Sequence, residues 1–442
     1  MSLSLALPHG GPRLVANARV DAVPGAAEVE TDGSKLLNAS TDDVLGLATD
    51  TRVKEAAAAA IRRFGLEVTR SSTLVSQLES RLAARLKADA AALVDSFSTA
   101  LRALEQAEAT RLVDARLTRR TGLSGLTFSS PEHLAQRLAA THGERVVLID
   151  GVRPHEGDLA PLPRLLELAQ KAHAPTVVFD ALGPGPLGET GMGVLEHFEL
   201  SGQADLSVST LGGGAVVIAG VRAVVEAFVP FFAARVSAGA TAGLTRRLEL
   251  MELEAHRRAR ALELAQATLE ALRARAFDTG PSVSPIIPVW MGDEGLTDLW
   301  LRQLAESGVF ARGVLDGPRS RLVFSVPATW TDAQLGLFVD ALDKIARRLG
   351  APPPLDPEAP RAVTVARPGS FATATPCHPR WLPVAESANP PVLNDGRSVR
   401  ERLFDTVETL TWRIASGQSG QLRRLPGART LRALVDRARD KR

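Results

Sequence analysis

The chain has 442 residues, 45% of them hydrophobic, and a formal net charge of +2. This supports a large subunit with a sizeable core and excludes the strongly basic character of a nucleic-acid-binding protein. The single cysteine, Cys377, excludes an internal disulfide. No apolar run is long enough to span a membrane and the start has no signal-peptide pattern, so we expect a cytoplasmic protein.

The first part of the chain predicts an extended segment followed by two helices. Residues 1–50 contain short apolar runs, two of them separated by a turn at Gly33. The Ala-rich stretch 52–64 is typical of a helix that ends at Gly65. Residues 74–87 carry leucines at helical spacing and predict the second helix.

Residues 91–99 indicate a strand that runs into the start of a helix. Free N–H groups at such a start favour an anion such as a phosphate, but a hydroxyl of Ser98 or Thr99 that caps the helix is an equally good interpretation. Similar patterns predict strands at 112–118, 146–150, 176–180, 282–291, 309–315 and 321–326, and helices at 162–173, 221–276, 294–307 and 331–349.

Residues 205–220 read as a buried strand, a glycine turn and a second strand. Further on, 350–398 holds 11 of the 28 prolines and is predicted to be a linker. The segment 421–442 has eight Arg or Lys against two Asp, so it can dock on an acidic partner or an anionic membrane surface. A solvated helix that packs on its own domain explains the same composition.

Four segments occur in the order known from one family. Asp43–Leu47 stands for Asp-Tyr-Leu-Gly-Leu, and Asp150–Leu162 matches Glu-Gly-Val-Phe-Ser-Met-Asp-Gly-Asp-x-Ala-Pro-Leu. Ser320–Val326 stands for Ala-Arg-Leu-Arg-Leu-Thr-Leu, and 205–220 for a segment with Asp, Thr and then a Lys. The chain thereby resembles the α-oxoamine synthases, pyridoxal-phosphate (PLP) enzymes of the aminotransferase fold that condense an amino acid with an acyl-CoA.

This resemblance implies an α/β fold, with an aminotransferase-type large domain built on a mostly parallel sheet plus a smaller α+β domain. It also implies four cofactor-binding residues. Ser96 stands at the phosphate-binding helix start, Phe97 matches the aromatic that stacks on the pyridine ring, and Thr210 keeps its place in the lysine segment. Asp180 matches the acid that pairs with the ring nitrogen.

Two questions about Asp180 stay open at this point. Aligned from Gly188–Gly193, the acid of the family falls on Phe179, and the position of a family histidine falls on Leu182 instead of Gly183. Asp180 can also be an acid at the end of a strand that merely caps the following loop.

The same alignment shows what the chain lacks. Gly213 stands where the family has the Schiff-base lysine, and no lysine occurs between Lys171 and Lys344. Positions where the family carries histidine, serine or arginine hold other residues: Val75, Thr118, Pro154, Leu182 or Gly183, and Val323. Without the lysine no internal aldimine forms, so we expect no covalently held PLP, whereas non-covalent binding remains open. His155, Glu156 and Asp158 are too close in sequence to indicate a metal site and are predicted to lie in a solvated loop.

Three interpretations of function follow from the resemblance. The chain is a non-catalytic subunit or regulator of a homologous acyl-CoA:amino-acid acyltransferase, it binds PLP or acyl-CoA in a transferase of altered chemistry, or it is a structural homodimer. Because the family works as dimers, we expect a homodimer or a heterodimer with a lysine-bearing homologue, and no nucleic-acid partner. The predicted divisions of the chain are an N-terminal segment of the small domain, the large domain, the C-terminal small domain, the linker and a basic helical tail, at 1–49, 50–275, 276–349, 350–398 and 399–442.

Overall fold

The computed structural model describes residues 12–211 and 215–352, and within them it has an α/β fold. Its helices are α1 (Thr51–Phe64), α2 (Thr73–Leu86), α3 (Phe97–Glu105), α4 (Ala115–Thr121), α5 (Pro131–Ala140), α6 (Leu162–Lys171), α7 (Val194–His197), α8 (Arg222–Phe228), the 3-10 helix η1 (Val229–Phe231), α9 (Ala238–Leu253), α10 (Ala255–Arg273), α11 (Glu294–Glu306) and α12 (Asp332–Leu349). Its strands are β1 (Arg13–Ala16), β2 (Ala22–Gly25), β3 (Glu28–Thr31), β4 (Ser34–Asn38), β5 (Glu67–Thr69), β6 (Ala90–Val94), β7 (Thr110–Asp114), β8 (Leu126–Phe128), β9 (Arg145–Val152), β10 (Thr176–Asp180), β11 (Leu206–Thr210), β12 (Val216–Gly220), β13 (Arg235–Ser237), β14 (Ile287–Trp290), β15 (Val309–Phe310), β16 (Arg312–Leu315) and β17 (Arg321–Phe324).

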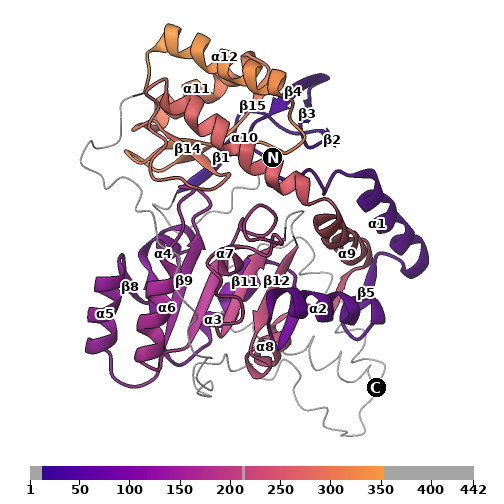
Figure 1. Cartoon of the computed structure of the whole chain (residues 1–442), viewed down its shortest axis with the longest axis vertical. Helices are drawn as coiled ribbons and strands as arrows, with labels where there is room; N and C mark the ends of the chain where they lie inside the picture. The colour runs from indigo at the N-terminus through magenta and orange to yellow at the C-terminus, as the bar shows by residue number, and fades with distance from the viewer. Residues whose placement is uncertain (1–11, 212–214, 353–442) are drawn as a thin grey trace, which may run out of the picture. The chain divides into compact units, whose positions relative to one another are not determined.

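A seven-stranded sheet has the order β6-β12-β11-β10-β9-β7-β8. Figure 1 labels four of its strands, β8, β9, β11 and β12. Only β12 in this sheet runs against its neighbours. Along β9, Val146 and Leu148 belong to one buried cluster, with side chains of α3 and α8, whereas Val147 and Ile149 belong to another, with side chains of α5 and α6. This alternation buries both faces of the sheet, which explains why its strands are almost continuously apolar.

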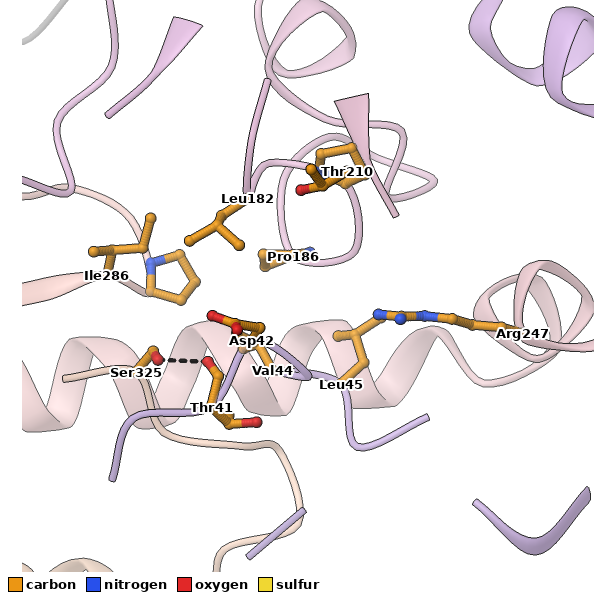
Figure 2. Close-up of a pocket in the computed structure, with 12 residues that line it drawn as sticks. Thr41, Asp42, Val44, Leu45, Leu182, Pro186, Thr210, Arg247, Ile286 and Ser325 are labelled. Carbon is orange, nitrogen blue, oxygen red and sulfur yellow. Dashed lines mark hydrogen bonds between the residues drawn. The ribbon is translucent and has the colours of Figure 1, made fainter. Parts of the chain in front are cut away.

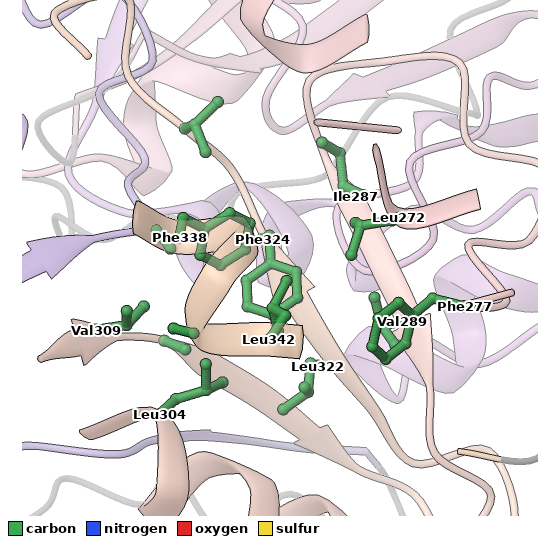
Figure 3. Close-up of a cluster of buried hydrophobic side chains, with 14 of the residues drawn as sticks. Leu272, Phe277, Ile287, Val289, Leu304, Val309, Leu322, Phe324, Phe338 and Leu342 are labelled. Atoms are coloured by element: carbon green, nitrogen blue, oxygen red, sulfur yellow. The ribbon is translucent and has the colours of Figure 1, made fainter. Parts of the chain in front are cut away.

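Strands far apart in sequence form two four-stranded sheets. The antiparallel sheet β1-β16-β17-β14 pairs Arg13 with Leu315, and the mixed sheet β15-β4-β3-β2 pairs Leu37 with Val309. Aliphatic side chains and several aromatic rings form the core beside them, as Figure 3 shows for part of the cluster. The Phe324 and Phe338 rings meet edge to face with centroids 5.0 Å apart.

The fold class that the resemblance implied is confirmed, but several element boundaries were wrong. The run 112–118 is not one strand, because β7 ends at Asp114, whose carboxylate accepts the N–H of Arg116 and starts α4. The stretch 221–276 contains a short strand, β13, as well as helices, and the non-helical residue Glu254 separates α9 from α10. Strand 309–315 is split in two, and only four residues of 282–291, Ile287–Trp290, form a strand, β14.

The predicted domain boundaries stay predictions. The linker 350–398, except for its first residues, and the tail 399–442 lie outside the described residues, so the proposed docking of 421–442 is not tested. Among the described helices, none is both long enough and apolar enough to span a membrane.

Candidate functional site

The four residues implied by the resemblance lie at one edge of the seven-stranded sheet. Asp180 ends β10 and Thr210 ends β11, its paired neighbour. Ser96 and Phe97 follow β6, and β12 joins β6 to β11 through Val216, which pairs with the ends of both strands. Since β6, β10 and β11 run in one direction, these residues gather at the carboxyl ends of parallel strands, where such sheets bind ligands.

The start of α3 is already capped by side chains. Ser96, not Ser98 or Thr99, is the N-cap, and its Oγ accepts the N–H of Thr99 at 3.1 Å. The Thr99 hydroxyl donates to the Asp95 carboxylate at 2.6 Å. Burial raises the pKa of Asp95, but hydrogen bonds from Thr99 and Ala233 outweigh it and lower the pKa overall, so this carboxylate is ionised near the helix start. A phosphate there meets a like charge.

The Phe97 ring is packed between two side chains. It meets the Phe179 ring edge to face at 5.4 Å between centroids. The Arg120 guanidinium lies over the ring, 5.2 Å from its centroid, and donates to the buried Asp150 carboxylate at 2.8 Å. A cation held by an ion pair therefore covers a face of the aromatic ring that the resemblance assigns to cofactor stacking.

Asp180 is turned into the loop that follows it. Its Oδ1 accepts the N–H of Gly183 at 2.8 Å and its Oδ2 accepts the N–H of Val194 at 2.7 Å. A Cβ on Gly193 would lie 2.1 Å from Oδ2, so this glycine permits the close approach. The geometry is that of the loop-capping interpretation, although each oxygen keeps a further lone pair.

Burial also changes the charge of Asp180. It raises the pKa of Asp180 to about 7, against the two backbone hydrogen bonds, and the nearby Asp150 adds to the rise. In the alternative alignment, the acid of the family falls on Phe179, but this side chain is buried in the apolar core beside the sheet. Asp180 is therefore the acidic side chain at the end of β10.

A cavity opens beside Thr210 at the same sheet edge (Figure 2). The cavity and its open mouth together have a volume of about 410 Å³. The inner part, in which the centre of a water molecule fits, is only about 10 Å³. The buried Thr210 hydroxyl has no hydrogen-bond partner within the described residues. The lining residues come from several elements: Thr41, Asp42, Val44, Leu45, Leu182, Pro184, Pro186, Thr210, Arg247, Pro285, Ile286 and Ser325.

Arg247 is a cavity residue that sequence reasoning missed. It lies on α9, is 4% exposed, and shares the buried face with Leu244, Leu248 and Met251. The signal in the sequence is its spacing from these residues, because a charged side chain at i+3 of an i, i+4, i+7 apolar stripe points into the core.

Positions where the family carries polar groups hold core residues here. Val75 is fully buried within a cluster of α1, α2 and α9 side chains, and Val323 is 6% exposed in β17. Leu182 lines the cavity, and Thr118 lies on α4 with a buried hydroxyl that has no described partner. None of these side chains supplies a base or a carboxylate clamp.

The motif Asp150–Leu162 forms ion pairs instead of a solvated loop, so that expectation was wrong. Asp158 is 9% exposed, lies 2.7 Å from Arg116 Nη1 and also pairs with Arg153. Glu156 accepts from Arg321 Nη2 at 2.6 Å.

His155, in the same motif, stays neutral. Burial and the nearby cations Arg321, Arg120 and Arg312 lower the pKa of His155 to about 3. Over residues 12–211 and 215–352, no cluster of three His, Cys, Asp or Glu side chains has the arrangement of a metal site.

Tested residue by residue, the described site fits PLP poorly. Thr210 offers a free hydroxyl and Asp180 is in place, but Asp95 stands at the helix start, Arg120 lies on Phe97, and the inner cavity admits little more than a water molecule. Gly213, at the position of the Schiff-base lysine, lies outside the described residues.

Comparison with known proteins identifies relatives, although no family model matches the chain. The 8-amino-7-oxononanoate synthase of Symbiobacterium thermophilum is 32% identical over 354 residues, which cover 72% of this chain and 90% of that enzyme. The 8-amino-7-oxononanoate synthase of Thermosipho melanesiensis is 28% identical over 361 residues, which cover 74% and 92% of the two chains.

Solved structures agree on the fold. A serine palmitoyltransferase from S. paucimobilis with bound PLP–myriocin aldimine has a TM-score of 0.70 at 21% identity, covering 75% of this chain and 93% of that one. The 8-amino-7-oxononanoate synthase from Francisella tularensis has a TM-score of 0.60 at 18% identity, covering 71% and 98% of the two chains. The order of the motifs, the sheet topology and an alignment spanning most of a relative together show that the chain belongs to the α-oxoamine synthase family.

Proposed function

We propose that this chain is a non-catalytic member of its family, acting as a subunit or regulator of a homologous acyl-CoA:amino-acid acyltransferase. The observation that carries the proposal is Gly213, which stands at the Schiff-base position in a chain without a lysine between Lys171 and Lys344. The family chemistry needs that amine to bind PLP covalently and to move the proton on the substrate carbon.

Described residues at the carboxyl ends of the parallel strands support the proposal. Arg120 and Asp150 form a buried ion pair on Phe97, and the Asp95 carboxylate is held near the helix start by Thr99. A site still selected for PLP gains nothing from these groups. The buried Asp150 is paired with Arg120, so removing either partner would leave an uncompensated buried charge.

A second function keeps one specific observation in its favour. The Thr210 hydroxyl, which has no partner among the described residues, lies at the carboxyl end of β11, in the place that the resemblance assigns to the phosphate site. Non-covalent binding of PLP or an acyl-CoA, in a transferase of altered chemistry, uses this group.

We further propose that the chain dimerises, with itself or with a lysine-bearing homologue. Leu66 and Leu253 are each 74% exposed, and Phe64 is 40% exposed. Phe64 ends α1 and Leu66 follows it beside the start of α9, where Ala238 N–H donates to Leu66 O, whereas Leu253 lies at the other end of α9. Exposed apolar side chains on adjoining elements favour an interface. A cytoplasmic location stays a prediction.

Absorbance and reduction test the loss of catalysis. The purified protein, mixed with PLP, is expected to show no visible band from a protein aldimine and no PLP trapped by borohydride. An intact 8-amino-7-oxononanoate synthase treated in parallel is the positive control. A borohydride-stable PLP adduct on the wild-type chain contradicts the proposal, whereas a reversible PLP complex without an adduct favours the second function.

Sedimentation and co-purification test the assembly. We expect a dimer, or a complex with a co-purifying homologue, that Leu66→Glu weakens. Leu337→Glu is the matched control, because Leu337 is 64% exposed on α12, which packs on α10 and α11. A stable monomer at micromolar concentration without a co-purifying homologue refutes the subunit proposal.

A further inference from the structure

Arg247 is a buried cation whose hydrogen bonds are incomplete. Its Nε and Nη1 are buried without a hydrogen-bond partner in the described part of the chain, and its Nη2 lies 3.5 Å from Asp43 Oδ1. Asp43 is engaged elsewhere, since its oxygens accept the N–H groups of Leu47 at 3.0 Å and Ala48 at 2.7 Å. Buried donors without acceptors are costly, so the unmet N–H groups call for an acceptor that residues 12–211 and 215–352 do not provide.

The guanidinium points into the cavity beside Thr210, as Figure 2 shows. Thr210 adds a second buried group without a partner among the described residues. Asp42, the other charged residue of the lining, is already paired, because Arg312 donates to its two oxygens at 3.1 and 2.7 Å. The unmet polar groups of the cavity are thus a cation and a hydroxyl, and both can donate to an anion.

The remaining wall of the cavity is mostly apolar: its two other polar residues are Thr41 and Ser325, and the Ser325 hydroxyl donates to the Thr41 carbonyl at 2.5 Å. Its apolar residues come from the Asp43–Leu47 turn, the loop after β10 and the segment before β14: Val44, Leu45, Leu182, Pro184, Pro186, Pro285 and Ile286. The inner space of about 10 Å³ suits one or two ligand oxygens, while the wider mouth can hold a short hydrocarbon body.

We propose that this cavity binds a small aliphatic carboxylate, with its carboxylate on Arg247 and Thr210 and its apolar part along Leu45 and Leu182. A guanidinium is the side chain best suited to a carboxylate. A doubly charged phosphate is disfavoured, because Asp43 lies next to Arg247 and the inner cavity is narrow. The inference goes beyond the proposed function, since it requires neither PLP nor a partner subunit.

Isothermal titration calorimetry on the full chain tests the site. The probes are propionate, isovalerate, neutral propionamide and inorganic phosphate, each at up to about 10 mM, which detects dissociation constants in the millimolar range. We expect the two carboxylates to bind wild type. Arg247→Met, which keeps the length and removes the charge, is expected to weaken binding at least about tenfold. Thr210→Val is expected to weaken it about threefold.

Arg246→Met is the matched control. Arg246 is the neighbouring residue on α9, but it is half-buried and pairs with Glu249 on its own helix, so its loss is expected to leave carboxylate binding unchanged. Thermal melts show whether each variant is folded, and Thr210→Val keeps the test informative if Arg247→Met unfolds.

Three results overturn the proposal. They are no heat from either carboxylate with wild type, equal binding by propionamide, and equal binding by folded Arg247→Met. Tighter binding of phosphate than of propionate overturns the carboxylate assignment. None of these results depends on whether borohydride traps PLP, so this proposal and the loss of catalysis fail separately.

Discussion

Replacing Asp180 by asparagine changes how stability depends on pH. The pKa of this carboxyl is 3.8 in an unfolded chain and about 7 in the fold, where it is completely buried. Because the folded value is raised, the folded state holds its proton more tightly, and ionisation destabilises the protein as pH rises from about 4 to 7. A rise of about three units at about 1.4 kcal/mol each corresponds to about 4 kcal/mol over the full range, of which about 2.5 kcal/mol falls between pH 5 and 8.

Urea unfolding of wild type and Asp180→Asn at pH 5, 6, 7 and 8 measures this effect. The difference between the two free energies of unfolding isolates Asp180 from other groups, such as His155, whose pKa is lowered and which destabilises the fold at acid pH. Wild type is expected to lose stability relative to the variant as pH rises. A constant difference refutes the reasoning. If wild type instead gains stability relative to the variant as pH rises, the hydrogen bonds from Gly183 and Val194 outweigh burial and lower the pKa of Asp180.

Three further substitutions test the site. Ser96→Ala removes the hydroxyl that caps α3 and is expected to cost about 1 kcal/mol in urea unfolding, and no loss would show that the cap is idle. Arg120→Met leaves the buried Asp150 charge unpaired and is expected to cost about 3 kcal/mol, whereas Arg119→Met, at a pair that is 42% exposed on the arginine side, is expected to cost less than about 1 kcal/mol. Equal losses would contradict the role of burial. Gly213→Lys alone is expected not to restore acyltransferase activity in a coupled CoA-release assay, because the family histidines and the carboxylate-binding arginine are also absent, and measurable turnover would contradict this.

Much of the fold is readable in the sequence because its signals are local. Gly65 has φ 81° and its N–H bonds to Ile61 O, as the predicted helix end requires. Gly33 turns between β3 and β4 with φ 75°. The order of the family motifs then predicts the order of these elements in the chain and the sheet that they form.

The site was less predictable because its properties depend on side chains distant in sequence. Arg120 lies on α4 and contacts Phe97 and Asp150 from there. The sequence pattern at 112–118 predicted one strand, so it did not indicate that a helix starts at Ala115. Likewise, the spacing of Arg247 predicts a buried face, but the missing acceptors become visible only when the turn at Asp43 and the end of β11 surround it.

The pairing of the first strands with the last has a consequence for synthesis on the ribosome. Arg13 in β1 pairs with Leu315 in β16, and Leu37 in β4 pairs with Val309 in β15, so these pairs form only after the later strand has been synthesised. About 300 residues must therefore emerge before the N-terminal segment finds its partners, and such long-range pairing is slow. The seven-stranded sheet has all its strands by Gly220 and can form earlier. A nascent chain that ends before β15 thus exposes unpaired edges of its N-terminal strands. We expect chaperones to bind this segment until β15 and β16 have been synthesised.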